Sequence, residues 1–287
     1  MRHASRPRSH GLQREQEDNL SERRPTEARN PKARGLDSFT TREVLELMND
    51  EDATIPPAVR AVLPAIERAV DEVVKAFGAG HRLRYIGAGT SGRLGVLDAS
   101  EAPPTFGVDE DLVRGIIAGG DEALRRSIEG AEDDSSTGAR AVREHVREGD
   151  VLVGISASGR AKFVTAGMVM AREIGARTIA LTCDASSPLA SDADIAIAVD
   201  VGPEVLAGSS RLKAGTATKL VLNMLSTAAM IRSGRTRGDL MIDVRPTNAK
   251  LRERAVRMVQ DESGLGEDEA RARLEAAGWS VRKALEE

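Results

Sequence analysis

The sequence of 287 residues has little of several residue types on which common functions depend. Its single cysteine, Cys183, allows neither a disulfide within the chain nor a cysteine-based zinc site. The four histidines lie far apart, so we expect no metal or other cofactor, and acid–base chemistry that rests on carboxylates. No apolar run approaches the roughly 20 residues of a membrane span, and no apolar signal segment is found near the start, which predicts a cytoplasmic protein.

Aromatic residues and excess positive charge are also scarce. Aromatic residues make up 2% and the net charge is −4, so the sequence lacks the ring platforms and the positive field that bind nucleic acid. Positive charge is concentrated in residues 1–36, which contain nine Lys and Arg residues but five Asp and Glu residues. The composition of residues 1–25 predicts a disordered basic tail. We therefore expect neither a nucleic-acid partner nor a membrane.

The hydrophobic pattern of the remaining chain predicts helices first and then a sheet. Thr40 and Thr41 are good caps for a helix to Asp52, and an apolar stripe over 59–77 predicts another, bent at Pro64. Strands are predicted at 83–87, 114–119, 151–155, 177–183 and 194–201, and further helices at 90–100, 121–130, 136–147, 161–174 and 211–232. This alternation predicts a doubly wound α/β sandwich with a five-stranded parallel sheet, which binds ligands at the carboxyl ends of its strands.

Two loops at that edge carry hydroxyl groups and glycines. Residues 87–92 read G-A-G-T-S-G between a strand and a helix, a pattern also found in dinucleotide-binding proteins. The second strand does not end in the acid that would hold the ribose of NAD, whereas Thr90 and Ser91 offer hydroxyls. Residues 156–160 contain Ser156, Ser158 and Gly159 before a helix, which is typical of an anion nest. Together the loops favour a phosphorylated small molecule.

A third segment and two acids complete the candidate site. Residues 202–219 precede and open the long helix, and they include Glu204, Ser209, Ser210 and Lys213. The helix start again offers donors to an anion, although a capped helix with solvated basic residues has the same pattern. Glu101 and Glu132 each follow an element that leaves the ligand-binding edge, but position alone does not single them out among the 45 acidic residues.

Six long motifs resemble the N-acetylmuramic acid 6-phosphate etherase family of the sugar isomerase (SIS) superfamily. They are TEARNP (26–31), LELMNDED (45–52), YIGAGTSGRLGVLDASEAPPTFG (85–107), EGAEDD (129–134), GPEVLAGSSRLKAGTATKLVLNMLST (202–227) and MIDVRPTNAKLRERA (241–255). The resemblance implies an SIS domain with N-terminal helices over 26–240 and a homodimer with sites near the subunit interface. It also implies a lyase of peptidoglycan recycling and amino sugar catabolism, which converts N-acetylmuramate 6-phosphate into N-acetylglucosamine 6-phosphate and D-lactate.

The same resemblance implies roles for the candidate residues. Glu101 matches the proton donor and Glu132 the second catalytic acid/base. The phosphate and the sugar hydroxyls are expected to contact Thr90, Ser91, Ser156, Ser158 and Gly159, and the roles of Glu204, Ser209, Ser210 and Lys213 stay open. The family usually has threonine where this chain has Ala161, so one hydrogen bond to phosphate is expected to be lost.

The C-terminal part and two alternative functions complete the prediction. Residues 241–287 are expected to form a helical domain, whose last two helices resemble a ubiquitin-associated hairpin with Trp279 in its core. One alternative is a non-catalytic regulator that binds sugar phosphates and resembles glucokinase regulatory protein, which has two SIS domains in a much longer chain. The other is an aldose–ketose isomerase of the same superfamily. The presence of both Glu101 and Glu132 favours the lyase.

Overall fold

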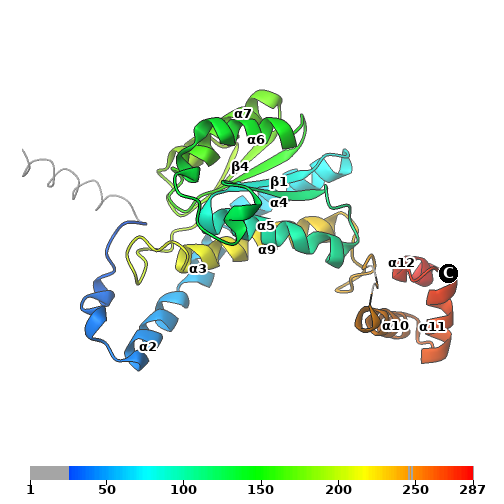
Figure 1. Ribbon diagram of the computed structural model, residues 1–287. Helices are drawn as coiled ribbons and strands as arrows, with labels where there is room; N and C mark the ends of the chain where they lie inside the picture. The colour runs from blue at the N-terminus through cyan, green and yellow to red at the C-terminus, as the bar shows by residue number, and fades with distance from the viewer. Residues whose placement is uncertain (1–25, 245, 247, 287) are drawn as a thin grey trace, which may run out of the picture.

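A five-stranded, all-parallel sheet forms the centre of the molecule (Figure 1). A computed structural model describes residues 26–244, 246 and 248–286, so the predicted basic tail lies outside the described residues. The strands are β1 (Leu83–Gly87), β2 (Val113–Ile117), β3 (Val151–Ile155), β4 (Arg177–Thr182) and β5 (Ile195–Ala198), in the order β2-β1-β3-β4-β5. The predicted doubly wound α/β fold with five parallel strands is confirmed.

Helices cover both faces of the sheet (Figure 1). One face packs against α4 (Leu63–Gly78), α5 (Gly89–Phe106) and α9 (Lys213–Arg232), and the other against α6 (Ser135–His145), α7 (Lys162–Ile174) and α8 (Pro188–Asp192). Strand β1 shows the reason: Tyr85 points into the first core and Ile86 into the second, because successive side chains of a strand alternate. Burial on both sides explains the nearly continuous apolar strand sequences.

Short helices precede the sheet. Two 3₁₀ turns, η1 (Pro31–Ala33) and η2 (Leu36–Ser38), lead into α2 (Thr41–Asp52), which begins with a capping box between Thr40 and Glu43. The bent helix predicted over 59–77 is instead two helices, α3 (Ile55–Ala61) and α4. Pro64 lies in the first turn of α4, where its missing N–H costs nothing, so the proline starts a helix rather than bending one.

Two further local predictions were wrong. Residues 121–130 form no α-helix but only the 3₁₀ turn η3 (Asp121–Leu124), followed by η4 (Ala131–Asp133). Gly120 and Gly130 flank this segment with positive φ, and it has too few apolar residues to bury a helical face. The helix predicted over 90–100 is also longer than expected, because Pro103 and Pro104 do not end α5. The helix continues to Phe106, which is buried in the core, and Gly107 ends it with φ 63°.

The C-terminal residues form three helices around a small apolar cluster of their own, at some distance from the sheet in Figure 1. These are α10 (Ala249–Ser263), α11 (Glu267–Ala276) and α12 (Val281–Glu286), as predicted from the sequence. Trp279 packs against this cluster with a φ of 62°, and the Arg252 guanidinium lies 4.9 Å from the centre of its ring. The likeness to a ubiquitin-associated hairpin stays a prediction.

Candidate functional site

Strands β1 and β3 pair at the centre of the sheet, and the chain leaves them towards opposite faces. Strand β1 leads into α5 on one face, whereas β3 leads into α7 on the other. Gly87 at the end of β1 pairs with Ile155 at the end of β3, so the two predicted loops begin side by side. This arrangement is a topological switch point, where open α/β sheets bind their ligands.

The loop after β1 is a tight turn with hydroxyls at the start of α5. A Cβ atom on Gly87 would lie 2.6 Å from the backbone nitrogen of Gly92, so the close turn requires glycine there. Thr90 and Ser91 are half-buried in the first turn of α5. Their hydroxyls and the free N–H groups of this helix start are available to an anion or a sugar.

The loop after β3 has the same character. Ser156 is buried, Ser158 is half-buried, and Gly159 takes a φ of 64° before α7 begins. Ala161 is the N-cap of α7 and offers no side-chain hydrogen bond to the helix. The N-terminal N–H groups of α7 and the neighbouring serine hydroxyls can therefore bind a phosphate.

The third predicted segment is mainly occupied by contacts within the protein. The buried carboxylate of Glu204 accepts hydrogen bonds from the backbone N–H groups of Lys213 at 2.9 Å and Ala214 at 3.0 Å, so it caps α9. The Lys213 ammonium is buried as well and lies 2.7 Å from Glu51. Substrate contacts of Glu204 and Lys213 remain a prediction, and the same holds for Ser209 and Ser210, which lie half-buried in the turn before α9.

Glu101 lies on α5 at a cavity of about 260 Å³ between α5 and α9. The cavity is lined by Asp98, Glu101, Ala102, Thr105, Phe106, Asn223, Ser226, Thr227, Ile231, Thr236, Gly238, Asp239 and Met241. No sequence pattern marks Asp98, whose carboxylate accepts hydrogen bonds from the hydroxyls of Tyr85 at 2.7 Å and Ser226 at 3.0 Å. Burial raises the pKa of Asp98, against the effect of these two donors.

Glu132 lies exposed in η4, on the other side of the sheet. Turn η4 packs against α7, and the Lys162 ammonium at the start of α7 lies 3.9 Å from Asp133, the neighbour of Glu132. Glu132 is thereby close to the helix that follows the second serine loop. Within one chain, Glu101 lies on α5, which covers one face of the sheet, and Glu132 lies in the turn η4, which packs against α7 on the other face, so the two glutamates are not brought together.

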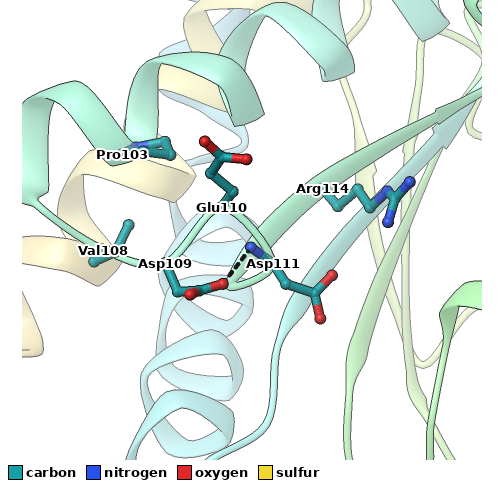
Figure 2. A pocket seen from close by; sticks show the side chains of 6 residues that line it. All are labelled: Pro103, Val108, Asp109, Glu110, Asp111 and Arg114. Atoms are coloured by element: carbon teal, nitrogen blue, oxygen red, sulfur yellow. Dashed lines mark hydrogen bonds between the residues drawn. The ribbon is translucent and has the colours of Figure 1, made fainter.

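A larger pocket of about 730 Å³ lies near the start of β2 (Figure 2), and its lining includes no residue of the hydroxyl loops. Its lining residues are Pro103, Val108, Asp109, Glu110, Asp111 and Arg114. The three acids come from the turn before β2, where the backbone N–H of Asp111 donates to Asp109 at 2.8 Å. Because this pocket lies at the amino end of the sheet and is mainly acidic, we do not place a phosphorylated sugar there.

The described residues contain neither a membrane-spanning helix nor a metal-binding cluster. No helix in this part of the chain is long and apolar enough to cross a membrane. The same residues contain no group of three or more His, Cys, Asp and Glu side chains that could hold a metal ion.

The chain is similar to known proteins over most of its length. Residues 65–172 match the family model of the glucokinase regulatory protein N-terminal SIS domain, and residues 133–228 match that of the SIS domain. An N-acetylmuramic acid 6-phosphate etherase of Mesorhizobium japonicum is 53% identical over 91% of this chain and 85% of its own length. The N-acetylmuramic acid 6-phosphate etherase of Jannaschia sp. is 54% identical over 91% of this chain and 83% of its own length.

Solved structures with the same fold are more distant in sequence. A phosphoheptose isomerase from Neisseria gonorrhoeae has a TM-score of 0.51 at 21% identity, and the match covers 66% of this chain and 98% of that one. A candidate sugar-phosphate isomerase from Listeria monocytogenes has a TM-score of 0.52 at 15% identity. This match covers 69% of this chain and 94% of that one. At these identities the two structures support the fold alone.

Proposed function

The chain belongs to the N-acetylmuramic acid 6-phosphate etherase family, and we propose how its residues carry out the reaction. It is a carbon–oxygen lyase of cell-wall sugar recycling, which cleaves the D-lactyl ether of N-acetylmuramate 6-phosphate. The observation that carries this function is identity above 50% to etherases over 91% of the chain. These relatives do not favour a non-catalytic regulator. An isomerase is supported only by a similar fold in isomerase structures of low sequence identity.

The reaction needs one group that takes a proton and one that gives a proton. The ether oxygen is attached to C3, which is β to the aldehyde carbon C1 of the opened sugar. Removal of the C2 proton, made acidic by that carbonyl group, expels lactate as an acid protonates the ether oxygen. Water then adds to C3 of the unsaturated aldehyde and a proton returns to C2, which yields N-acetylglucosamine 6-phosphate and D-lactate. Two carboxyl groups in different environments can divide this work.

We assign the two proton transfers to Glu101 and Glu132. Glu101, at the rim of the α5–α9 cavity, gives its proton to the leaving lactate, and Glu132 takes the C2 proton and assists the entering water. The 6-phosphate binds where the loops after β1 and β3 meet, held by N-terminal N–H groups of α7 and by the hydroxyls of Ser156 and Ser158. Anchoring the phosphate keeps C2 and C3 in place for the two glutamates.

A homodimer completes the site in this proposal. Since the two glutamates lie on opposite faces of one chain, Glu132 would work with Glu101 of the partner subunit. The surface around Glu101 supports this arrangement, because Leu97 on α5 and Met224 and Ile231 on α9 are 46%, 38% and 48% exposed. Such large apolar side chains are typical of an interface when they gather on neighbouring helices.

Mixing two inactive variants tests the shared site. Glu101→Gln and Glu132→Gln chains, unfolded together and refolded at equal amounts, should form mixed dimers that contain one intact pair of glutamates. Random pairing predicts recovery of about a quarter of the wild-type activity for a two-fold symmetric dimer. Each variant refolded alone serves as the control. No recovery in the mixture would place both glutamates of one site in the same chain.

The activity itself is tested with the pure protein. Incubation with N-acetylmuramate 6-phosphate should release D-lactate, measured with a D-lactate-specific assay, and N-acetylglucosamine 6-phosphate should release none. Absence of D-lactate would contradict the assigned function. We also propose a cytoplasmic enzyme without a nucleic-acid partner, in keeping with the free, buried thiol of Cys183.

A further inference from the structure

A half-buried carboxyl group near Glu101 has no part in the proposed reaction. Asp98 lies three residues before Glu101 on α5, so the two side chains lie on the same side of the helix, and both line the α5–α9 cavity. Its two oxygens accept hydrogen bonds from Tyr85 on β1 and Ser226 on α9. One carboxyl group thus joins the central strand to both helices of the cavity.

A carboxyl group that joins these three elements lowers the stability of the fold relative to an apolar contact. Asp98 itself is half-buried, but the two hydroxyl-bearing residues that it bonds are buried between β1, α5 and α9, with Tyr85 1% and Ser226 7% exposed. Partial removal of this carboxyl group from water raises its pKa and costs free energy that an apolar side chain of similar size would not cost. Its fixed geometry at the Glu101 cavity is therefore better explained by a role in the reaction than by stability.

The backbone of α5 lacks two of its helical hydrogen bonds close to Glu101. Pro103 and Pro104 lie inside α5 directly after Glu101 and Ala102, and a proline has no N–H to donate. The carbonyl groups of Ala99 and Ser100 consequently lack their usual helical hydrogen bonds from four residues later. The turn that carries Glu101 is weakened on its C-terminal side, whereas the bonds of Asp98 hold it on its N-terminal side.

We propose that Asp98 is a positioning residue, which holds the turn of α5 that carries Glu101 through its hydrogen bonds to Tyr85 and Ser226. The inference rests on the proposed role of Glu101 as the acid that protonates the departing lactate oxygen. Loss of these bonds should misplace Glu101 and slow the cleavage of the C3–oxygen bond. Removal of the C2 proton, assigned to Glu132, should not depend on them.

Two substitutions that each remove one hydroxyl group test this separation of steps. Tyr85→Phe and Ser226→Ala leave Asp98 in place, and Ser100→Ala is a matched control, since the Ser100 hydroxyl donates to the Leu97 carbonyl of its own helix. In deuterated water, kcat for lactate release should fall about tenfold in Tyr85→Phe, less than the roughly hundredfold loss of a 1 Å misplacement because the Ser226 bond remains, with KM within about twofold. Deuterium exchange at C2 of the recovered substrate should be undiminished, so the ratio of exchange to lactate should rise.

The outcomes separate the proposal from the function on which it rests. Equal falls in exchange and lactate release would show that the bonds serve only folding, and unchanged lactate release would show that they serve neither purpose; both results overturn the inference. A wild-type chain that releases no lactate would overturn the assigned function instead. Should Tyr85→Phe not fold, Asp98→Asn, which keeps the shape and one acceptor oxygen, must show the same raised ratio.

Discussion

The ammonium of Lys213 lies 2.7 Å from a carboxylate oxygen of Glu51, 162 residues earlier in the chain. The two side chains are 3% and 7% exposed. Glu51 also accepts hydrogen bonds from Asn30 and Lys32, each at 2.9 Å. The carboxylate therefore fastens residues 30–51 to the start of α9, beside the loop that the sequence marks as part of the site.

Removal of the Glu51 charge should destabilise the protein. Glu51→Gln leaves the buried Lys213 ammonium without its counter-charge, which costs about 3 kcal/mol in the free energy of unfolding. Urea unfolding measures this loss. The matched control is Glu46→Gln, because Glu46 pairs with Arg42 on the exposed side of α2 and such pairs contribute about 0–1 kcal/mol. Equal losses in both variants would contradict a buried ion pair.

The same pair predicts how stability depends on pH. Burial raises the pKa of Glu51, but hydrogen bonds from Lys213 and Lys32 outweigh it and lower this pKa from 4.5 to about 2. Ionised Glu51 thus stabilises the fold fully above pH 4.5, and this contribution is lost as the pH falls from 4.5 towards 2. The difference in unfolding free energy between wild type and Glu51→Gln should shrink over this interval. A constant difference would argue against the pair.

Replacement of Glu101 should abolish most turnover without harming the fold. Because Glu101 is exposed at the cavity rim, Glu101→Gln should keep the wild-type melting temperature and bind N-acetylglucosamine 6-phosphate normally. Turnover should fall at least about a hundredfold, the usual effect of a positioned acid. Glu110→Gln, in the acidic pocket of Figure 2, is the control and should retain full activity. Near-normal lactate release from Glu101→Gln would refute its role.

Much of the fold can be predicted because each strand is a short apolar run in the sequence. Contacts between segments that are distant in the sequence leave no such local pattern. Parallel pairing of β1 and β3 places the two hydroxyl loops together, as the order of elements predicts. Glu204 and Lys213 are site candidates with open roles in the sequence, and the structure adds contacts that no motif shows: Glu204 caps α9 and Lys213 binds Glu51. A charge pair 162 residues apart has no local signature.

Restoring a hydroxyl group at position 161 should improve both folding and binding. Ala161 is the N-cap of α7 and makes no capping hydrogen bond, so Ala161→Thr should raise the free energy of unfolding by about 1 kcal/mol. The same hydroxyl should tighten binding of N-acetylglucosamine 6-phosphate by about threefold, as for one neutral hydrogen bond. Ala161→Val has the same shape without the hydroxyl and should show neither gain. Weaker binding by Ala161→Thr in calorimetry would contradict this account of the loop.

The central claim is an elimination followed by hydration, and labelled solvent tests it most directly. The wild-type enzyme should be allowed to convert N-acetylmuramate 6-phosphate in water that contains deuterium and ¹⁸O, and both products analysed by mass spectrometry and NMR. The account predicts N-acetylglucosamine 6-phosphate with solvent deuterium at C2 and solvent oxygen at C3, and lactate that keeps the original ether oxygen. The mechanism would be contradicted if lactate carried solvent oxygen and the sugar carried no deuterium at C2, even if the overall activity were present.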